Sequence, residues 1–210
     1  MVKYKIIDDF LNEQDFNELC SLNLKNIKDN EIHVYKNHMH KDGELLEVDC
    51  INEETIKRLS KNYHDKVMEV LRELNPEKAK LYEYSKFDIV NIGPKYKFTI
   101  HDDQPETLLS TVIYLKPYNN TGTSFYDNKR GDNKKDIEWR QNRALFFSRK
   151  ERKTWHSFEG DGKSNRITLV YNLMTNDIRS VCKIEGVNYY LSIFRNYINP
   201  YLYRFLKFTI

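Results

Sequence analysis

The residues best suited to chemistry lie in the stretch 97–103, which reads Lys-Phe-Thr-Ile-His-Asp-Asp. Its first half alternates and predicts a strand that leads into His101, Asp102 and Asp103. Because side chains of an extended chain repeat every two residues, His101 and Asp103 should share one face and Asp102 the other. An imidazole beside a carboxylate supplies two of the three ligands of a facial 2-His-1-carboxylate site for ferrous iron. Alone, the pattern also fits a solvated strand end, so a second histidine is required.

His156, in the stretch Trp-His-Ser, supplies the second imidazole. A Gly-Asp-Gly-Lys turn centred on Asp161 follows, and then an apolar strand pattern that contains Arg166 and Thr168. A hairpin folded about Asp161 would set His156 opposite Arg166, since the two lie equally far from the turn. A guanidinium pairs a carboxylate bidentately, and the hydroxyl of Thr168 on the same face adds one bond. This spacing predicts a cosubstrate that chelates iron at one end and carries a carboxylate at the other.

The order of these motifs resembles the core of the Fe(II)/2-oxoglutarate-dependent dioxygenases, closest to their prolyl 4-hydroxylase-like branch. The matching segments are His101-Asp102-Asp103, Tyr114-Leu115, Gly122-Thr123-Ser124-Phe125, residues 144–147, Trp155-His156-Ser157 and Arg166-Ile167-Thr168. Residues 6–11 also resemble the strand-to-helix start of that branch. One departure is Thr121-Gly122-Thr123, where a Gly-Gly pair is common, and we expect it to alter a turn but not the metal site.

The resemblance implies a set of site residues. The implied iron ligands are His101, Asp103 and His156. Arg166 would pair the far carboxylate of 2-oxoglutarate, helped by Thr168. Tyr114 matches a position whose hydroxyl often reaches the same carboxylate, although a core aromatic on a central strand fits its pattern equally well. Asn91 falls where some relatives place another cosubstrate contact.

The resemblance also implies an activity. It calls for Fe(II), 2-oxoglutarate and O2, with ascorbate as an accessory reductant, and for hydroxylation of an unactivated C–H with release of succinate and CO2. Asp103 argues against a halogenase, which needs that coordination position for halide. The favoured substrate is a prolyl or other amino-acid side chain, in a peptide or a small molecule. Sugars and nucleotides stay open as substrates.

The surrounding patterns predict a mainly β protein with flanking helices. Residues 3–7 form a strand, Asn12 caps a helix that ends near Leu24, and Asn52 caps a longer helix over 52–74 that stops at Asn75-Pro76. Beyond residue 81 the predicted strands are 81–92, 96–100, 108–115, 123–126, 144–148, 155–158 and 166–173. Many short strands separated by turns favour a sandwich or barrel. With the resemblance, this is a double-stranded β-helix (jelly-roll) core buttressed by N-terminal helices.

We expect a single domain over residues 1–210, built of an N-terminal strand and helices (1–80), the jelly-roll core (81–175) and a C-terminal extension (176–210). Within it, His38-x-His40 fits an edge hairpin around Asp42-Gly43 better than a metal site. The segment 127–143 reads as a long, charged, mobile loop. Helices over 187–197 and 201–208 should cover one side of the barrel or form an oligomer contact, with a membrane-surface helix as a weaker alternative.

Composition limits the remaining choices. The 210 residues are 40% hydrophobic and 13% aromatic, which suffices for a core. A net charge of +3 is too balanced to argue for nucleic acid by itself. Three cysteines without metal-binding spacing fit reduced thiols. The sequence shows no signal-peptide pattern and no apolar run of about 20 residues, so we expect a cytoplasmic protein without a membrane span. Oligomeric state is open.

Three alternatives compete with the oxygenase interpretation. A non-catalytic jelly-roll binding module would not need the triad together with Arg166. An iron oxygenase or cupin-like enzyme without 2-oxoglutarate would not need Arg166 and Thr168. A nucleic-acid demethylase could use the basic segment 128–153, in which Trp139 would stack a base, although a charged, solvated lid is the commoner explanation of such a segment.

Overall fold

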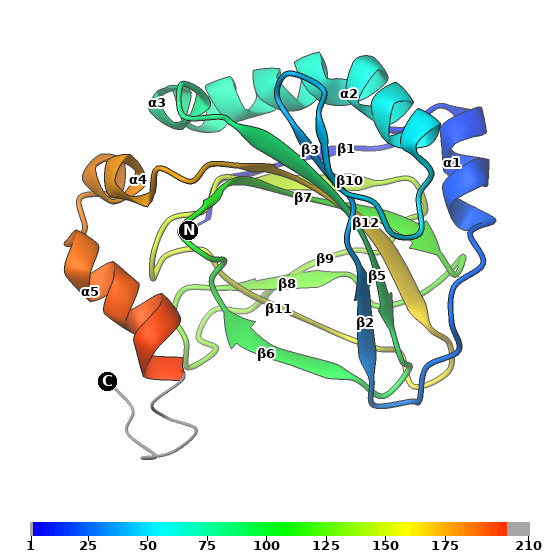
Figure 1. Ribbon diagram of the computed structural model, residues 1–210. Coiled ribbons are helices and arrows are strands. Elements are labelled where there is room, and N and C mark those ends of the chain that lie inside the picture. The colour runs from blue at the N-terminus through cyan, green and yellow to red at the C-terminus, as the bar shows by residue number, and fades with distance from the viewer. Residues whose placement is uncertain (1, 201–210) are drawn as a thin grey trace.

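The fold is given by a computed structural model that describes residues 2–200 (Figure 1). Two antiparallel sheets form its centre. The eight-stranded sheet runs in the order β1 (Tyr4–Ile7), β10 (Ala144–Phe147), β7 (Thr107–Lys116), β12 (Arg166–Met174), β5 (Tyr84–Ile92), β3 (His38–His40) and β4 (Leu45–Glu47), with β2 (Ile32–Tyr35) also paired to β5. The four-stranded sheet runs in the order β6 (Lys97–His101), β11 (Trp155–Glu159), β8 (Thr123–Tyr126) and β9 (Lys135–Ile137).

The predicted fold class is confirmed. All seven strands expected between residues 81 and 173 are present, with ends shifted by at most three residues. The expectation of one long loop over 127–143 is wrong, because β9 lies inside it and pairs with β8. Its sequence, Lys-Asp-Ile, is too short and too charged to show a strand pattern.

Alternation along the strands separates an inner face from an outer face. On β12, Ile167 and Leu169 turn outward into the main hydrophobic core, whereas Arg166 and Thr168 turn inward. On β7, Ile113 and its apolar neighbours likewise face outward. The sandwich interior holds a smaller apolar cluster of Phe125, Ile137, Leu145 and Phe147 together with polar side chains such as Arg166 and Thr168.

Helices cover the outer face of the large sheet. Helix α2 (Glu53–Leu74) lies along it at the top of Figure 1, and Asn52 caps it by accepting from the Thr55 N–H at 2.9 Å. Helix α1 (Glu13–Cys20) ends four residues before the predicted end at Leu24. The reason is that Leu22 and Leu24 pack on the core from a non-helical segment.

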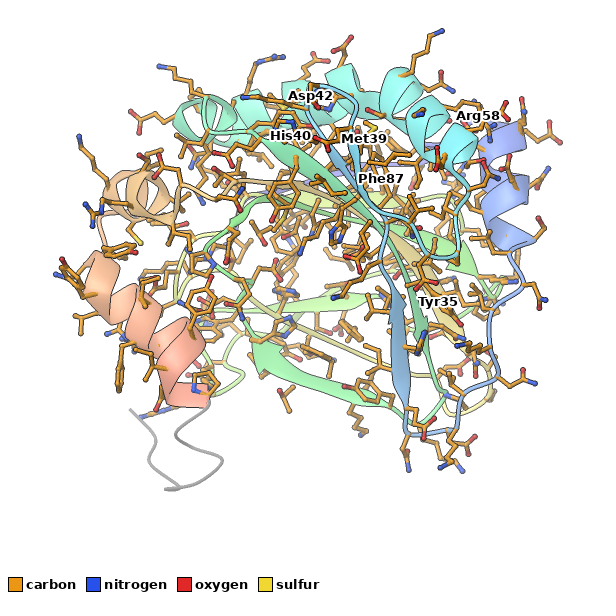
Figure 2. All side chains as sticks on the ribbon, in the orientation of Figure 1. Tyr35, Met39, His40, Asp42, Arg58 and Phe87 are labelled. Carbon is orange, nitrogen blue, oxygen red and sulfur yellow. The ribbon has the colours of Figure 1, made fainter. Side chains whose placement is uncertain are left out.

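Helices α1 and α2 are joined by a buried carboxylate. Asp15 accepts from Arg58 Nε at 2.8 Å and from the Tyr63 hydroxyl at 2.6 Å, and its side chain is fully buried. Figure 2 labels Arg58 at the end of α2 that approaches α1. The short helix α3 (Pro76–Ala79) follows α2 directly and was not predicted.

The C-terminal segment is helical, as expected, and also contains one helix that the sequence did not predict. Helix α4 (Ile178–Glu185) was not predicted; it ends at Gly186, whose φ of 69° is favourable for glycine. Helix α5 (Tyr189–Ile193) continues into the π-helical turn η1 (Phe194–Ile198), in place of the helix predicted over 187–197. The helix predicted over 201–208 lies outside the described residues.

The hairpin expected around Asp42-Gly43 is present as β3 and β4. His38 Nε2 lies 3.1 Å from an Asp88 oxygen, and His40 Nδ1 lies 2.9 Å from an Asp42 oxygen. Among residues 2–200, these histidines join no cluster of three possible metal ligands.

A membrane span was not expected. In the part of the chain that the structure describes, no helix combines the length and the apolar character needed to cross a bilayer.

Candidate metal and cosubstrate site

The two predicted histidines are cross-strand neighbours in the small sheet. His101 on β6 lies directly opposite His156 on β11, and their ring centroids are 4.2 Å apart. The predicted hairpin between β11 and β12 is wrong, because β11 pairs with β6 and β8 whereas β12 pairs with β5 and β7. His156 and Arg166 therefore lie in different sheets.

The turn after β11 explains this error. The Gly160 N–H donates to the Tyr96 carbonyl at 2.9 Å, and the Gly162 N–H donates to the Pro94 carbonyl at 2.8 Å. A Cβ on Gly160 would lie 2.1 Å from the Pro94 oxygen, so only glycine permits this approach. These contacts hold the turn after β11 against the connection between β5 and β6. The chain then returns to the large sheet as β12.

Three side chains converge at the end of β6. His101 Nε2 lies 4.0 Å from Asp103 Oδ1, and His156 Nε2 lies 3.7 Å from the same oxygen. All three ligand atoms lie within 4.8 Å of one another. Asp102 points away and accepts the Arg152 N–H at 2.6 Å, as strand parity predicts. The structure thus brings together the three residues expected to bind iron.

Each of these side chains is oriented by a second contact. His101 Nδ1 lies 2.9 Å from the Thr99 carbonyl oxygen, and His156 Nδ1 lies 2.9 Å from that of Thr154. A carbonyl accepts only, so Nδ1 carries the proton and Nε2 keeps its lone pair for a metal. The Ser110 hydroxyl donates to Asp103 Oδ2, which leaves Oδ1 toward the histidines. The sequence offered no local signal for Ser110, because it reaches Asp103 from the next strand.

The electrostatics keep this donor set in its ligating form. Burial and the neighbouring His156 lower the pKa of His101 to about 4, so its imidazole is neutral near pH 7. Burial disfavours the charged form of Asp103, but His156, His101 and the Ser110 hydroxyl outweigh it and hold the Asp103 pKa below its ordinary value. Neutral imidazoles and an ionised carboxylate are what a divalent metal requires.

Arg166 is a buried cation with no anionic partner among residues 2–200. Its side chain is 1% exposed, and its guanidinium carbon lies 4.9–5.4 Å from the ring centroids of three aromatic residues, which are Tyr114, Trp139 and Phe158. Nε donates to the Thr121 carbonyl at 3.3 Å, but one terminal nitrogen has no hydrogen-bond partner among the described residues. Burial lowers the Arg166 pKa to about 10, so the group stays charged.

Tyr114 and Thr168 lie beside this guanidinium. They are partners on β7 and β12, and both are fully buried. The Tyr114 hydroxyl donates to Thr123 Oγ1 at 3.0 Å, and its ring stacks on Trp139 at 4.5 Å. The proposal that Trp139 stacks a nucleic-acid base is therefore wrong, since Trp139 is buried against Tyr114 and donates to the Pro117 carbonyl.

Asn91 does not reach this site. It lies opposite Ile167, on the outward face of the large sheet, and donates to the Lys25 carbonyl at 3.2 Å. The expected cosubstrate contact at Asn91 is therefore not supported.

Aromatic contacts connect the arginine with the histidines. Phe158 lies 4.9 Å from the Arg166 guanidinium and stacks on Phe98 at 4.9 Å; Phe98 meets His101 at 4.3 Å. Sequence reasoning missed Trp139 and Phe158 as residues around Arg166, because nothing in their local patterns shows what they face.

Fold and site together define a jelly roll with a potential 2-His-1-carboxylate centre at one end. A buried arginine in the facing sheet forms no ion pair with any described residue. No protein-family model matches the sequence, and a search of curated proteins also finds no match.

Solved structures do match the fold. A Pseudomonas putida prolyl-4-hydroxylase is 13% identical, with a TM-score of 0.57 over 84% of this chain and 94% of its own. An oxidoreductase of the 2OG-Fe(II) oxygenase family from Burkholderia pseudomallei is 14% identical, with a TM-score of 0.57 over 81% and 85%. A Trichoplax adhaerens prolyl hydroxylase, solved with a hypoxia inducible factor peptide fragment, is 14% identical, with a TM-score of 0.55 over 85% and 86%. At these identities the likeness establishes the fold, and the expected resemblance is confirmed at that level.

Proposed function

We propose that this protein is an Fe(II)- and 2-oxoglutarate-dependent dioxygenase that hydroxylates an unactivated C–H bond. The observation that carries the proposal is the guanidinium of Arg166, buried in the jelly roll with no counter-ion in the part of the chain that the structure describes. Burying a charge without a partner lowers the stability of the fold, so such a group is expected to bind an anion. A metal triad alone would fit many oxygenases, whereas triad and arginine together fit 2-oxoglutarate.

His101, Asp103 and His156 would hold the metal. Their donor set, two imidazoles and one carboxylate, is the one that suits ferrous iron, and it leaves coordination positions open. When bound, iron and its cosubstrate supply the redox chemistry, in which 2-oxoglutarate, O2 and R–H give succinate, CO2 and R–OH. The backbone carbonyls of Thr99 and Thr154 fix both imidazole tautomers for this task.

Arg166 would pair the carboxylate at the far end of 2-oxoglutarate. The aromatic rings around it exclude water and strengthen this ion pair. Thr168 would add one hydroxyl contact from the same face of β12. The Tyr114 hydroxyl is already bonded to Thr123. Tyr114 would therefore contribute mainly through its ring.

The substrate we favour is a prolyl or other amino-acid side chain, in a peptide or small molecule. Support comes from two of the structures with the same fold, which are prolyl hydroxylases, one of them solved with a peptide. Trp139 does not support a nucleic-acid substrate, because its side chain is buried.

The direct test is anaerobic. Fe(II) and then 2-oxoglutarate are added to the purified protein, and the weak visible charge-transfer band of an iron–2-oxoglutarate chelate is recorded. His156→Ala should abolish the band. Arg166→Gln should keep it but require about 100-fold more 2-oxoglutarate, because a buried ion pair loses one partner. Lys163→Gln, an exposed change on the turn before Arg166, is the control and should behave as wild type.

Each other outcome points to a definite alternative. Iron binding without a band would contradict 2-oxoglutarate use and favour an oxygenase with another cosubstrate. Absence of iron binding would favour the non-catalytic binding module.

A further inference from the structure

A cleft of about 340 Å³ opens beside His101, between the end of β6, the turn before β11 and the C-terminal helical turn η1. Its lining includes His101, Asp102, Lys129, Glu151, Arg152 and Trp155. A volume of this order holds a small molecule or part of a larger one. His101, a proposed iron ligand, lines the cleft, whereas Asp103 and His156 do not.

The two carboxylates of the cleft are already engaged. Asp102 accepts the backbone N–H of Arg152, and Glu151 accepts from Ser192 at 2.5 Å and from Arg195 at 3.1 Å. Glu151 also faces the buried Arg149 at 3.5 Å. Glu151 is therefore paired with Arg195, whereas Asp102 keeps a negative charge that offsets one of the remaining cations.

Two cationic side chains of the cleft have no bonding partner among the described residues. The side chains of Arg152 and Lys129 are exposed and make no hydrogen bond or ion pair with any residue in 2–200. The nearest acid to Arg152, Asp102, bonds its backbone and not its guanidinium. The cleft therefore has an excess of positive charge at its rim.

The backbone of Arg152 is held in an unusual conformation. Its φ is 58°, in the left-handed region that non-glycine residues rarely adopt. Its N–H donates to Asp102, and its carbonyl accepts the Trp155 indole N–H at 3.0 Å. Contacts on both sides thus fix an arginine at the mouth of the cleft, and strain maintained in this way is typical of functional positions.

We propose that the substrate of this oxygenase carries an anionic group, a carboxylate or a phosphate, which Arg152 binds with help from Lys129 at the His101 end of β6. This inference rests on the proposed function and narrows its substrate class. A planar guanidinium binds both kinds of anion through two parallel hydrogen bonds. Arg152 is then a specificity-determining residue, separate from Arg166 and its cosubstrate.

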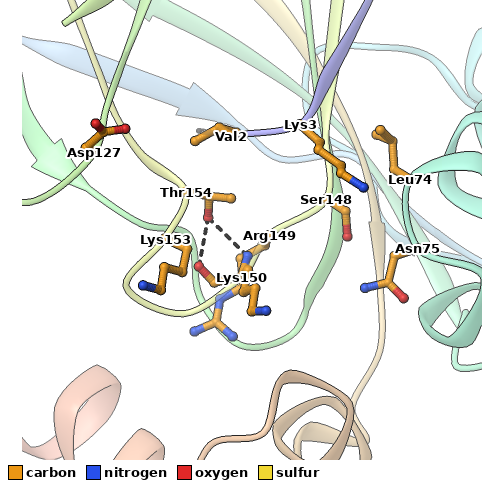
Figure 3. Close-up of a pocket in the computed structure, with 10 residues that line it drawn as sticks. All are labelled: Val2, Lys3, Leu74, Asn75, Asp127, Ser148, Arg149, Lys150, Lys153 and Thr154. Carbon is orange, nitrogen blue, oxygen red and sulfur yellow. Dashed lines mark hydrogen bonds between the residues drawn. The ribbon is translucent and has the colours of Figure 1, made fainter. Parts of the chain in front are cut away.

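A second basic pocket provides the control. Figure 3 shows a pocket of about 620 Å³ lined by Lys3, Lys150 and Lys153, with the Thr154 hydroxyl bonded to the Lys150 backbone. Lys150 lies on the same turn as Arg152 but faces this other pocket. Its replacement removes the same charge without touching the cleft.

The test uses the two tryptophans of the chain as separate reporters. The Trp155 indole N–H lies in the cleft, and the Trp139 indole lies beside Arg166. In ¹⁵N-labelled full-length protein saturated with Zn(II) and 2-oxoglutarate, methyl phosphate and acetate are titrated separately at constant ionic strength in chloride. Trp155→Phe assigns the two indole signals.

The Trp155 signal should shift saturably with at least one of the two anions. Arg152→Gln should weaken that binding about tenfold, Arg152→Lys should restore part of it, and Lys150→Gln should leave it unchanged. A preference for methyl phosphate or for acetate identifies the anionic group. A shift that does not saturate, or that Lys150→Gln weakens as much as Arg152→Gln, overturns the inference.

The Trp139 signal separates this inference from the proposed function. If Trp139 responds to Zn(II) and 2-oxoglutarate while Trp155 ignores both anions, the proposed function stands and the anionic substrate is refuted. If Trp155 responds to anions through Arg152 but Trp139 does not respond to 2-oxoglutarate, the anion site stands and the proposed cosubstrate fails.

Discussion

At the scale of single residues, each side chain of the candidate metal site is held by a hydrogen bond that restricts its rotation. Both histidines bond a carbonyl two residues earlier on their own chain, and Asp103 is held by Ser110 from β7. A site whose ligands are oriented in advance loses less entropy when a metal binds.

Asp103 and Asp102 should respond differently to substitution. Asp103→Ala removes an iron ligand and should abolish iron-dependent turnover and weaken Fe(II) binding by about 100-fold or more. Asp102→Asn keeps a hydrogen-bond acceptor for the Arg152 N–H and should retain most of both. Competition with a chelator measures the affinities, and equal losses would contradict the assignment of the two faces of β6.

Ser110→Ala should weaken Fe(II) binding by about tenfold, because Asp103 loses the hydroxyl that orients it. The matched control is Ser124→Ala on β8, which removes a comparable bond to the exposed Asp136. The same chelator competition applies. A tenfold loss in the control as well would indicate a general effect of losing a serine hydroxyl.

At the scale of elements, the N-terminal helices are fastened to each other by charge as well as by apolar packing. Burial raises the pKa of Asp15, but the Tyr63 hydroxyl, Arg58 and Asn62 outweigh it, so the pKa lies below its ordinary value of 3.8. A carboxylate with a depressed pKa stabilises the folded state above its unfolded pKa, and this contribution is lost as pH falls through the folded pKa.

Asp15→Asn should therefore lower the free energy of unfolding by about 3 kcal/mol at pH 7. The difference from wild type should shrink below about pH 4, where the wild-type carboxyl also becomes protonated. Urea unfolding at a series of pH values measures this. A difference that stays constant down to pH 3 would show that the Asp15 charge does not contribute.

At the scale of the whole molecule, a buried charge network joins the C-terminal helices to the candidate site. Glu185 of α4 accepts from Arg149 at 2.7 Å and from Lys78 at 2.6 Å, and all three side chains are at most 2% exposed. Arg149 Nε also donates to the backbone carbonyl of Asp103 at 3.0 Å. The network therefore reaches from α3 and α4 to a proposed iron ligand.

Glu185→Ala should lower the free energy of unfolding by about 4 kcal/mol, because it leaves two buried cations without their partner. Lys183→Ala, an exposed change on the same helix, should stay within about 0.5 kcal/mol of wild type. Urea unfolding of both variants provides the comparison. A small effect in Glu185→Ala would mean that α4 detaches without disturbing the core.

The sequence predicted what depends on short-range periodicity. Alternation located the strands, and parity placed His101 and Asp103 on one face. Prediction from the sequence failed where segments distant along the chain determine the environment of a side chain. The pairing of His156 depends on Gly160 packing against Pro94, and the burial of Trp139 depends on Tyr114.

Helix α4 was not predicted for a related reason. Helix α4 has a short apolar stripe, and its stability comes from Glu185 meeting charges on segments more than 30 residues away. A contact with residues so distant in the sequence cannot be predicted from a local pattern.

The division of the proposed site between two sheets has a consequence for affinity. The metal ligands belong to the small sheet and Arg166 to the large one. A cosubstrate held at both ends would be a divalent ligand, whose second contact is intramolecular once the first has formed. The spacing of the two layers then sets the effective concentration of that second contact. Loosening the sandwich far from either end should therefore weaken cosubstrate binding with every direct contact chemically intact.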